Sequence, residues 1–146
     1  MQSKNDIYII YDDCPNQEQT DLLTNNLSEI ANQKKGMPPI RDYAFFLMRS
    51  DQIMGGICGC MYYGCLYIDE LWIDASLRGH GYGTQLVNNA VNLAREQQCL
   101  FCTVNTMDWE AKDFYLKLGF EIEFTRRGYL HNSVKYMLRK NLYQEA

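Results

Sequence analysis

A glycine-rich turn between a strand and a helix is the feature that most limits what this chain can fold into. Residues 71–73 end an apolar, β-rich run, and residues 78–83 follow as Arg-Gly-His-Gly-Tyr-Gly. Apolar residues at helical spacing begin at Leu86. The first amides of a helix lack internal partners and lie at the positive end of the macrodipole, and glycines carry no Cβ that would keep a ligand away from them. The pattern therefore predicts a strand, a turn and a helix, with a pyrophosphate bound at the turn.

Two common phosphate-binding motifs do not match this turn. The dinucleotide motif needs a third glycine where Thr84 stands, and the P-loop needs a lysine that is absent after Gly81 and Gly83. What remains is Arg-x-x-Gly-x-Gly after a strand, in which Arg78 adds a fixed positive charge suited to phosphate. A glycine connection without a ligand is the alternative, but three alternate glycines beside an arginine exceed what a turn requires.

Hydrophobic periodicity along the rest of the chain predicts a mixed α/β sheet in which strands outnumber helices. Asp108 is the expected N-cap of the last helix, and Gly119 is expected to end it at C′. We expect strands at 6–11, 43–49, 52–62, 65–74, 99–105, 120–125 and 133–139, and helices at 16–35, after the glycine turn, and from Trp109.

Length and charge exclude several classes of protein. The 146 residues predict one domain over 1–146, and the net charge of −4 argues against a nucleic-acid binder. No apolar segment is long enough to span a membrane, and no export signal opens the chain, so we expect a cytoplasmic protein without a membrane partner. Cys99 and Cys102 have the spacing of metal ligands, but we interpret them as buried free thiols and expect no metal.

Two motifs together carry a resemblance to a known family. Residues 78–83 resemble the acyl-CoA signature of the GNAT superfamily of N-acyltransferases, and residues 71–73 resemble its splayed strand. Residues 111–120, Ala-Lys-Asp-Phe-Tyr-Leu-Lys-Leu-Gly-Phe, are similar to the family motif A-x-x-F-Y-x-K-x-G-F. The resemblance covers about residues 43 to 140. Asp108 stands where the family usually carries asparagine, which puts its contact with the cofactor in doubt.

The resemblance implies a fold, a cosubstrate and a set of binding residues. The fold is a mixed, mostly antiparallel sheet of about six or seven strands with a parallel central pair and three or four helices, and such domains often form homodimers. The cosubstrate is acetyl-CoA and the acceptor an amine. The residues it places at the cosubstrate are Leu71, Trp72, Ile73, Arg78, Gly79, His80, Gly81, Tyr82, Gly83, Thr84, Asn105 and Tyr115.

Acetyl transfer to an amine needs an acid for the leaving thiolate and a base for the amine. The resemblance places Tyr115 as the acid, beside the thioester sulfur. Asp69 and Glu70 precede the splayed strand residues, and they resemble the acidic pair of the polyamine acetyltransferases. Because consecutive strand residues face opposite sides, only one of the two is expected to line the site, and a water chain is a third possibility for the base. Glu70 is slightly preferred because of its longer reach.

Three functions fit these motifs. The first is an N-acetyltransferase that acts on a primary amine of a small molecule. The second is a protein acetyltransferase that acts on an N-terminus or a lysine, and the third is a non-catalytic acyl-CoA sensor. The presence of both Tyr115 and an acidic pair argues against the sensor. The acceptor itself is not specified by the sequence.

Overall fold

The computed structural model describes residues 5–143, and the chain divides into two compact units between Pro39 and Ile40. The first unit contains α1 (Gln17–Lys35), which begins at a capping box formed by Asn16 and Gln19 and ends at Gly36 in the left-handed conformation. Residues 6–11 form no strand, so that prediction is wrong. A strand needs a hydrogen-bonded neighbour, and no strand of the sheet pairs with this segment.

The second unit is built on a six-stranded mixed sheet in the order β1-β2-β3-β4-β6-β5. Only β3 and β4 pair in parallel, and the other neighbours are antiparallel, which confirms the predicted fold class. The strands are β1 (Arg41–Arg49), β2 (Gln52–Tyr62), β3 (Cys65–Ile73), β4 (Phe101–Met107), β5 (Glu121–Tyr129) and β6 (Ser133–Asn141).

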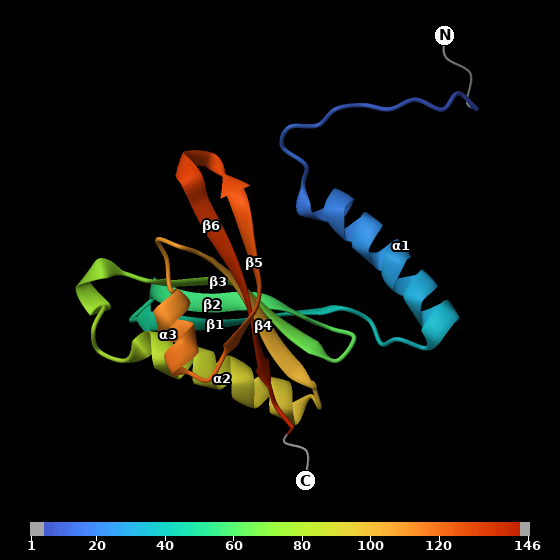
Figure 1. Ribbon diagram of the computed structural model, residues 1–146. Helices are drawn as coiled ribbons and strands as arrows, with labels where there is room; N and C mark the ends of the chain where they lie inside the picture. The colour runs from blue at the N-terminus through green and yellow to red at the C-terminus, as the bar shows by residue number, and fades with distance from the viewer. Residues whose placement is uncertain (1–4, 144–146) are drawn as a thin grey trace. The chain divides into compact units, whose positions relative to one another are not determined.

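Helix α2 (Tyr82–Glu96) lies along one face of the sheet, beside β1, β2 and β3 (Figure 1). It buries a stripe of apolar side chains with the spacing expected of an amphipathic helix. These side chains pack with the inward-facing residues of the strands into one core. The fully buried members with the largest volumes are Phe120, Ile57, Leu66, Ile68, Leu138, Val87, Val104 and Cys102.

Helix α3 (Lys112–Lys117) is shorter than the sequence predicts. Asp108 is not its N-cap, because residues 108–111 form a turn and Ala111 occupies the cap position. The Asp108 amide instead donates to the carbonyl of Val134, at the start of β6. The helix stops as predicted, since Gly119 follows the C-cap with φ +92°.

Cys99 and Cys102 are both buried and free, as predicted, although Cys99 precedes β4 rather than lying in it. No group of three metal-ligating side chains occurs within residues 5–143. None of the helices in that part of the chain is both long and apolar enough to cross a membrane.

Candidate active site

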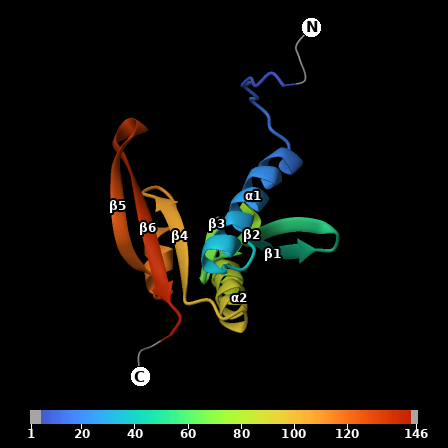
Figure 2. The same ribbon diagram turned by 90° about the vertical axis from the view of Figure 1, so that its right-hand side faces the viewer.

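The parallel strands β3 and β4 separate halfway along their length, and this separation creates the candidate site. Their pairing runs from Cys65 opposite Phe101 to Ile68 opposite Val104 and then stops. Figure 2 shows the two halves of the sheet, β1–β3 and β4–β6–β5, diverging from each other. A cavity of about 650 Å³ lies at the divergence. It is lined by Asp69, Glu70, Leu71, Trp72, Ile73, Arg78, Gly83, Val104, Asn105, Thr106, Glu110, Ala111, Phe114 and Tyr115.

A β-bulge in β3 turns both acidic residues toward the cavity. Cys58 of β2 pairs with Glu70, but the next residue, Gly59, pairs with Ile68, so Asp69 is the extra residue. Ile68 and Leu71, on either side of the acidic pair, both pack against the core. Asp69 and Glu70 therefore share the opposite face, and the expectation that only one of them could line the site is wrong.

Gly59 makes this bulge possible. A Cβ at Gly59 would collide with the carbonyl oxygen of Tyr67, which the bulge brings against β2. That carbonyl accepts a hydrogen bond of 3.0 Å from the hydroxyl of Tyr43, a core residue of β1. The close approach and the hydroxyl donor together hold β3 in the conformation that presents Asp69 and Glu70 side by side.

The glycine turn has the geometry of an anion site. Gly79 and Gly81 have φ of +80° and +83°, which L side chains rarely adopt, and Cβ atoms there would meet open space. Gly81 caps α2 without a side-chain hydrogen bond, so the first amides of the helix keep free donors. A second cavity, of about 280 Å³, lies over this turn and is lined by Ile73, Leu77, Arg78, Gly79, Gly81, Tyr82, Gly83, Thr84 and Phe114.

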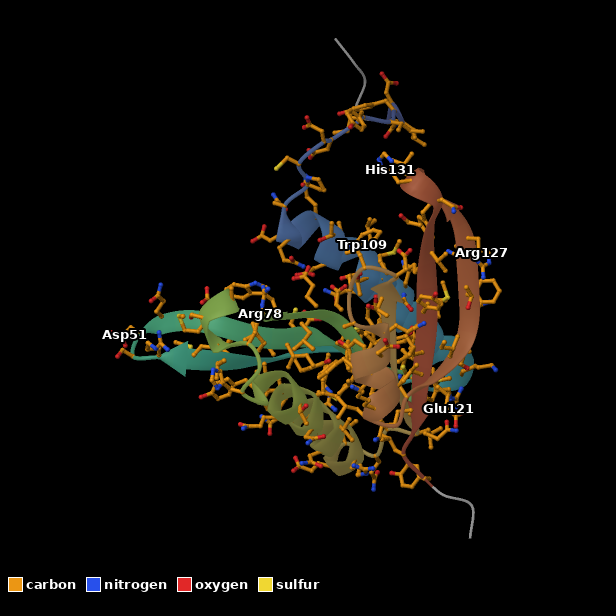
Figure 3. All side chains as sticks on the ribbon, turned by 60° about the vertical axis from the view of Figure 1, so that its left-hand side comes forward. Asp51, Arg78, Trp109, Glu121, Arg127 and His131 are labelled. Atoms are coloured by element: carbon orange, nitrogen blue, oxygen red, sulfur yellow. The ribbon has the colours of Figure 1, made fainter. Side chains whose placement is uncertain are left out.

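Arg78 stands at the junction of the two cavities, at the end of the connection from β3 (Figure 3). Its Nε donates to the carbonyl of Ile73 at 2.9 Å, which fixes the guanidinium beside the strand. The remaining guanidinium donors are available for a phosphate. The two cavities, the open glycine amides and this cation fit a long ligand with a phosphate at one end, which is the shape of an acyl-CoA.

Eleven of the twelve residues predicted at the cosubstrate line one or both cavities, and His80 lines neither. Leu71, Trp72, Ile73, Asn105 and Tyr115 line the large cavity, and Gly79, Gly81, Tyr82 and Thr84 line the small one. Ile73, Arg78 and Gly83 line both. Asp108 lines neither cavity.

Tyr115 lies on α3 with only 3% of its surface exposed. Its ring contacts Phe114 and Phe120 edge to face, with centroids 5.1 and 5.4 Å away. Burial raises the pKa of its phenol well above the ordinary value, and the nearby Glu110 carboxylate adds to the rise. The phenol is therefore protonated at neutral pH, as a proton donor must be.

Two polar lining residues, Glu110 and Thr106, were not predicted from the sequence. The Glu110 carboxylate accepts a hydrogen bond of 2.8 Å from the Met107 amide, and the buried Thr106 hydroxyl accepts one of 3.1 Å from the Ala111 amide. Both bonds shape the turn that leads into α3. The signal in the sequence was the short polar segment between β4 and the Phe-Tyr motif. It was overlooked because Asp108 was expected to be the N-cap of the helix.

The charges of the large cavity are separated along its length. Asp69 and Glu70 lie on the β3 wall, Glu110 lies on the turn before α3, and Arg78 lies toward the glycine turn. Within residues 5–143, no Lys, Arg or His nitrogen lies within 4.0 Å of a carboxylate oxygen of Asp69, Glu70 or Glu110. The end away from Arg78 is thus suited to a positively charged group.

Asn105 lies where the two strands diverge. Burial raises the pKa of the Tyr67 phenol on β3, and the Asn105 side chain works against that rise. Asn105 is the first residue of β4 beyond the parallel pairing. Its side chain therefore lines the large cavity at the point where the cavity opens.

The known proteins to which this chain is similar are named acetyltransferases. The model of the "Acetyltransferase (GNAT) family" matches residues 5–120. The blasticidin-S acetyltransferase of Streptomyces morookaense is 31% identical over 106 residues, which are 71% of this chain and 78% of the relative. The peptidyl-lysine N-acetyltransferase YjaB of Salmonella typhimurium is 39% identical over 56 residues, which are 38% of this chain and 37% of that one.

Solved structures show the same fold. An acetyltransferase from Bacillus cereus superimposes with a TM-score of 0.74 over 93% of this chain and 100% of its own, at 23% identity. The PaiA N-acetyltransferase of Thermoplasma acidophilum, solved in complex with coenzyme A, superimposes with a TM-score of 0.59 over 86% of this chain and 74% of its own, at 13% identity.

Proposed function

Because the chain belongs to the acetyltransferase (GNAT) family, we propose that it transfers the acetyl group of acetyl-CoA to a primary amine of a small molecule. The observation that carries the proposal is that Asp69, Glu70 and Tyr115 line one and the same cavity, which adjoins the glycine turn. The family model spans residues 5–120 and so includes parts of both compact units, which supports one acetyltransferase domain over 1–146. The six free cysteines suit the cytoplasm.

The cosubstrate supplies an acetyl group activated as a thioester, and the protein orients it and moves the protons. The open amides of the glycine turn and Arg78 hold the phosphates, while Leu71, Trp72 and Ile73 align the chain that carries the thioester. The unpaired main-chain donors of β3 beyond the bulge are suited to the carbonyl oxygen, where negative charge develops.

Proton transfer is assigned to the acidic pair and to Tyr115. The amine reaches the site as an ammonium ion, which loses a proton to Glu70 or Asp69, directly or through water. As the new C–N bond forms and the C–S bond breaks, the phenol of Tyr115 donates its proton to the departing sulfur, and the second proton lost by the nitrogen returns through water to the Tyr115 phenolate. The bulge allows both carboxylates to take part, so one can accept the proton while the other binds the ammonium group.

The similarity to a blasticidin-S acetyltransferase supports a small, amine-bearing acceptor. The shorter match to a peptidyl-lysine N-acetyltransferase supports the alternative, a lysine side chain of a protein. A panel of small amines and lysine peptides, with release of the CoA thiol as the readout, distinguishes the two. If only the peptides were turned over, the acceptor would not be a small molecule. If no amine of the panel led to release of CoA, the chain would not be a transferase.

The change Arg78→Ala is expected to raise the KM for acetyl-CoA by about tenfold, because a hydrogen bond to a charged group contributes about 1.5–3 kcal/mol. The KM for the amine should change little, since Arg78 lies toward the glycine turn, away from the acidic pair. Arg95→Ala, in the last turn of α2, is the matched control because Arg95 lines neither cavity. Initial-rate kinetics with each substrate varied in turn test this, and an unchanged KM for acetyl-CoA would remove Arg78 from the phosphate site.

A further inference from the structure

The residues that β4 contributes to the large cavity differ in their chemistry. Val104, Asn105 and Thr106 all line it, and Val104 is the apolar member of the three. Val104 is also the last residue of β4 that pairs with β3, because its partner is Ile68 and the pairing then stops. The backbones of the two strands are joined up to this point and apart beyond it. Val104 therefore lies at the closed end of the cavity, where the strands begin to separate.

The space behind Val104 is filled by the core of the protein. Only 2% of the Val104 surface and 1% of the Ile68 surface are exposed. Both residues belong to the buried cluster that also contains Leu66 and Leu138. Protein cores are close-packed and contain few voids larger than a water molecule. The cavity therefore ends at an apolar wall that cannot yield without a shift of its neighbours.

The proposed function directs two substituents of the thioester carbon. The sulfur lies at Tyr115 on α3, and the carbonyl oxygen is turned toward the main-chain donors of β3. Because the three substituents of a carbonyl carbon diverge in one plane, the remaining one, the methyl group of an acetyl, is turned toward the third wall, which is β4. Val104 offers an apolar surface there, and contact with it removes the methyl group from water.

We propose that Val104 forms the end wall of an acyl pocket and limits the length of the acyl group, which makes acetyl-CoA a better donor than propionyl-CoA or butyryl-CoA. The inference rests on the proposed function, because that function places the thioester. A longer acyl chain would have to displace the pair of Val104 and Ile68 or turn toward the polar side chains of Asn105 and Thr106. Val104 is then a specificity-determining residue, and it takes no part in proton transfer.

The test compares the three CoA thioesters as donors to one good amine, with release of the CoA thiol as the readout. We expect kcat/KM for acetyl-CoA to exceed that for propionyl-CoA by about 10- to 200-fold, the usual effect of one methylene group in an apolar pocket. Val104→Ala removes both γ-methyl groups from the end wall and should bring this ratio close to one. Val104→Ile adds a methyl group there and should increase the ratio.

Binding of the thioesters gives a second readout that needs no acceptor. Dissociation constants measured by calorimetry should rise from acetyl-CoA to butyryl-CoA in the unchanged protein, and the rise should be smaller in Val104→Ala. Val104→Ile keeps the core filled, so it tests the proposal even if Val104→Ala lowers the stability of the protein.

Val87→Ala is the matched control. Val87 lies on α2, is 1% exposed and lines neither cavity, so the change makes the same truncation elsewhere in the core. A general loss of packing lowers the rates with all three donors together, and the donor ratio should therefore stay unchanged in Val87→Ala.

Two results would overturn the acyl pocket alone: equal use of acetyl-CoA and propionyl-CoA by the unchanged protein, or a donor ratio that is the same in Val104→Ala. Discrimination among the thioesters in binding, without release of the CoA thiol for any amine, would support the pocket and overturn the proposed function.

Discussion

Replacement of Tyr115 by phenylalanine is expected to lower kcat by about 10²- to 10⁴-fold, the usual contribution of a general acid. The phenol is buried at the cavity between Phe114 and Phe120, and its raised pKa keeps it protonated at neutral pH. Phenylalanine keeps the edge-to-face packing and removes only the proton donor. The measurement is release of the CoA thiol under saturating acetyl-CoA and a good amine.

The matched control for this change is Tyr129→Phe, which removes a hydroxyl at the end of β5, a residue that lines neither cavity. The melting temperature of Tyr115→Phe should stay close to that of the unchanged protein, because the core loses no volume. The KM for acetyl-CoA should also change little. An unchanged kcat would show that the thiolate leaves without help from Tyr115 and that the acid assignment is wrong.

Gly59→Ala is expected to destabilise the protein by about 1–3 kcal/mol, because the added methyl group collides with main-chain atoms of Tyr67 that cannot move aside as a side chain would. Relief of the collision requires β3 to shift at the bulge. The shift would displace Asp69 and Glu70, and a displacement of about 1 Å can cost about 100-fold in rate. Denaturant unfolding and kcat/KM measure the two effects.

Cys58→Ala is the control for the change at Gly59. Cys58 precedes Gly59 on β2, and its half-buried side chain faces the open side of the sheet rather than the core. A small change in stability and an activity close to that of the unchanged protein are expected. If Gly59→Ala had equally small effects on stability and activity, β3 would tolerate a shift of the bulge. The bulge would then not be the feature that positions the acidic pair.

The sequence predicted the sheet well because its signals are local. Strand and helix positions agree with the structure to within a few residues from Tyr43 onward, since alternation and helical spacing are read within one element. The predictions of secondary structure were wrong where hydrogen bonding to another strand decides the local structure. Residues 6–11 have a β-rich composition but no strand partner, and Asp108 has the side chain of an N-cap but its amide bonds to β6.

The sequence by itself determined the glycine turn and the Phe114-Tyr115 motif, where we propose that the cosubstrate binds. The glycine turn and the Phe114-Tyr115 motif are short segments whose function depends on residues adjacent in the chain. A left-handed φ at Gly79 and Gly81 and free amides at the start of a helix follow from local chemistry alone. The resemblance to an acyltransferase family therefore emerged from about forty residues.

Only the tertiary structure brought together the carboxylates at the proposed acceptor end. Asp69 and Glu70 share a face because Gly59, about ten residues earlier on another strand, admits the Tyr67 carbonyl and so permits the bulge. Side-chain alternation along an isolated strand would place the two carboxylates on opposite faces, and it takes the close contact with β2 to reverse that rule.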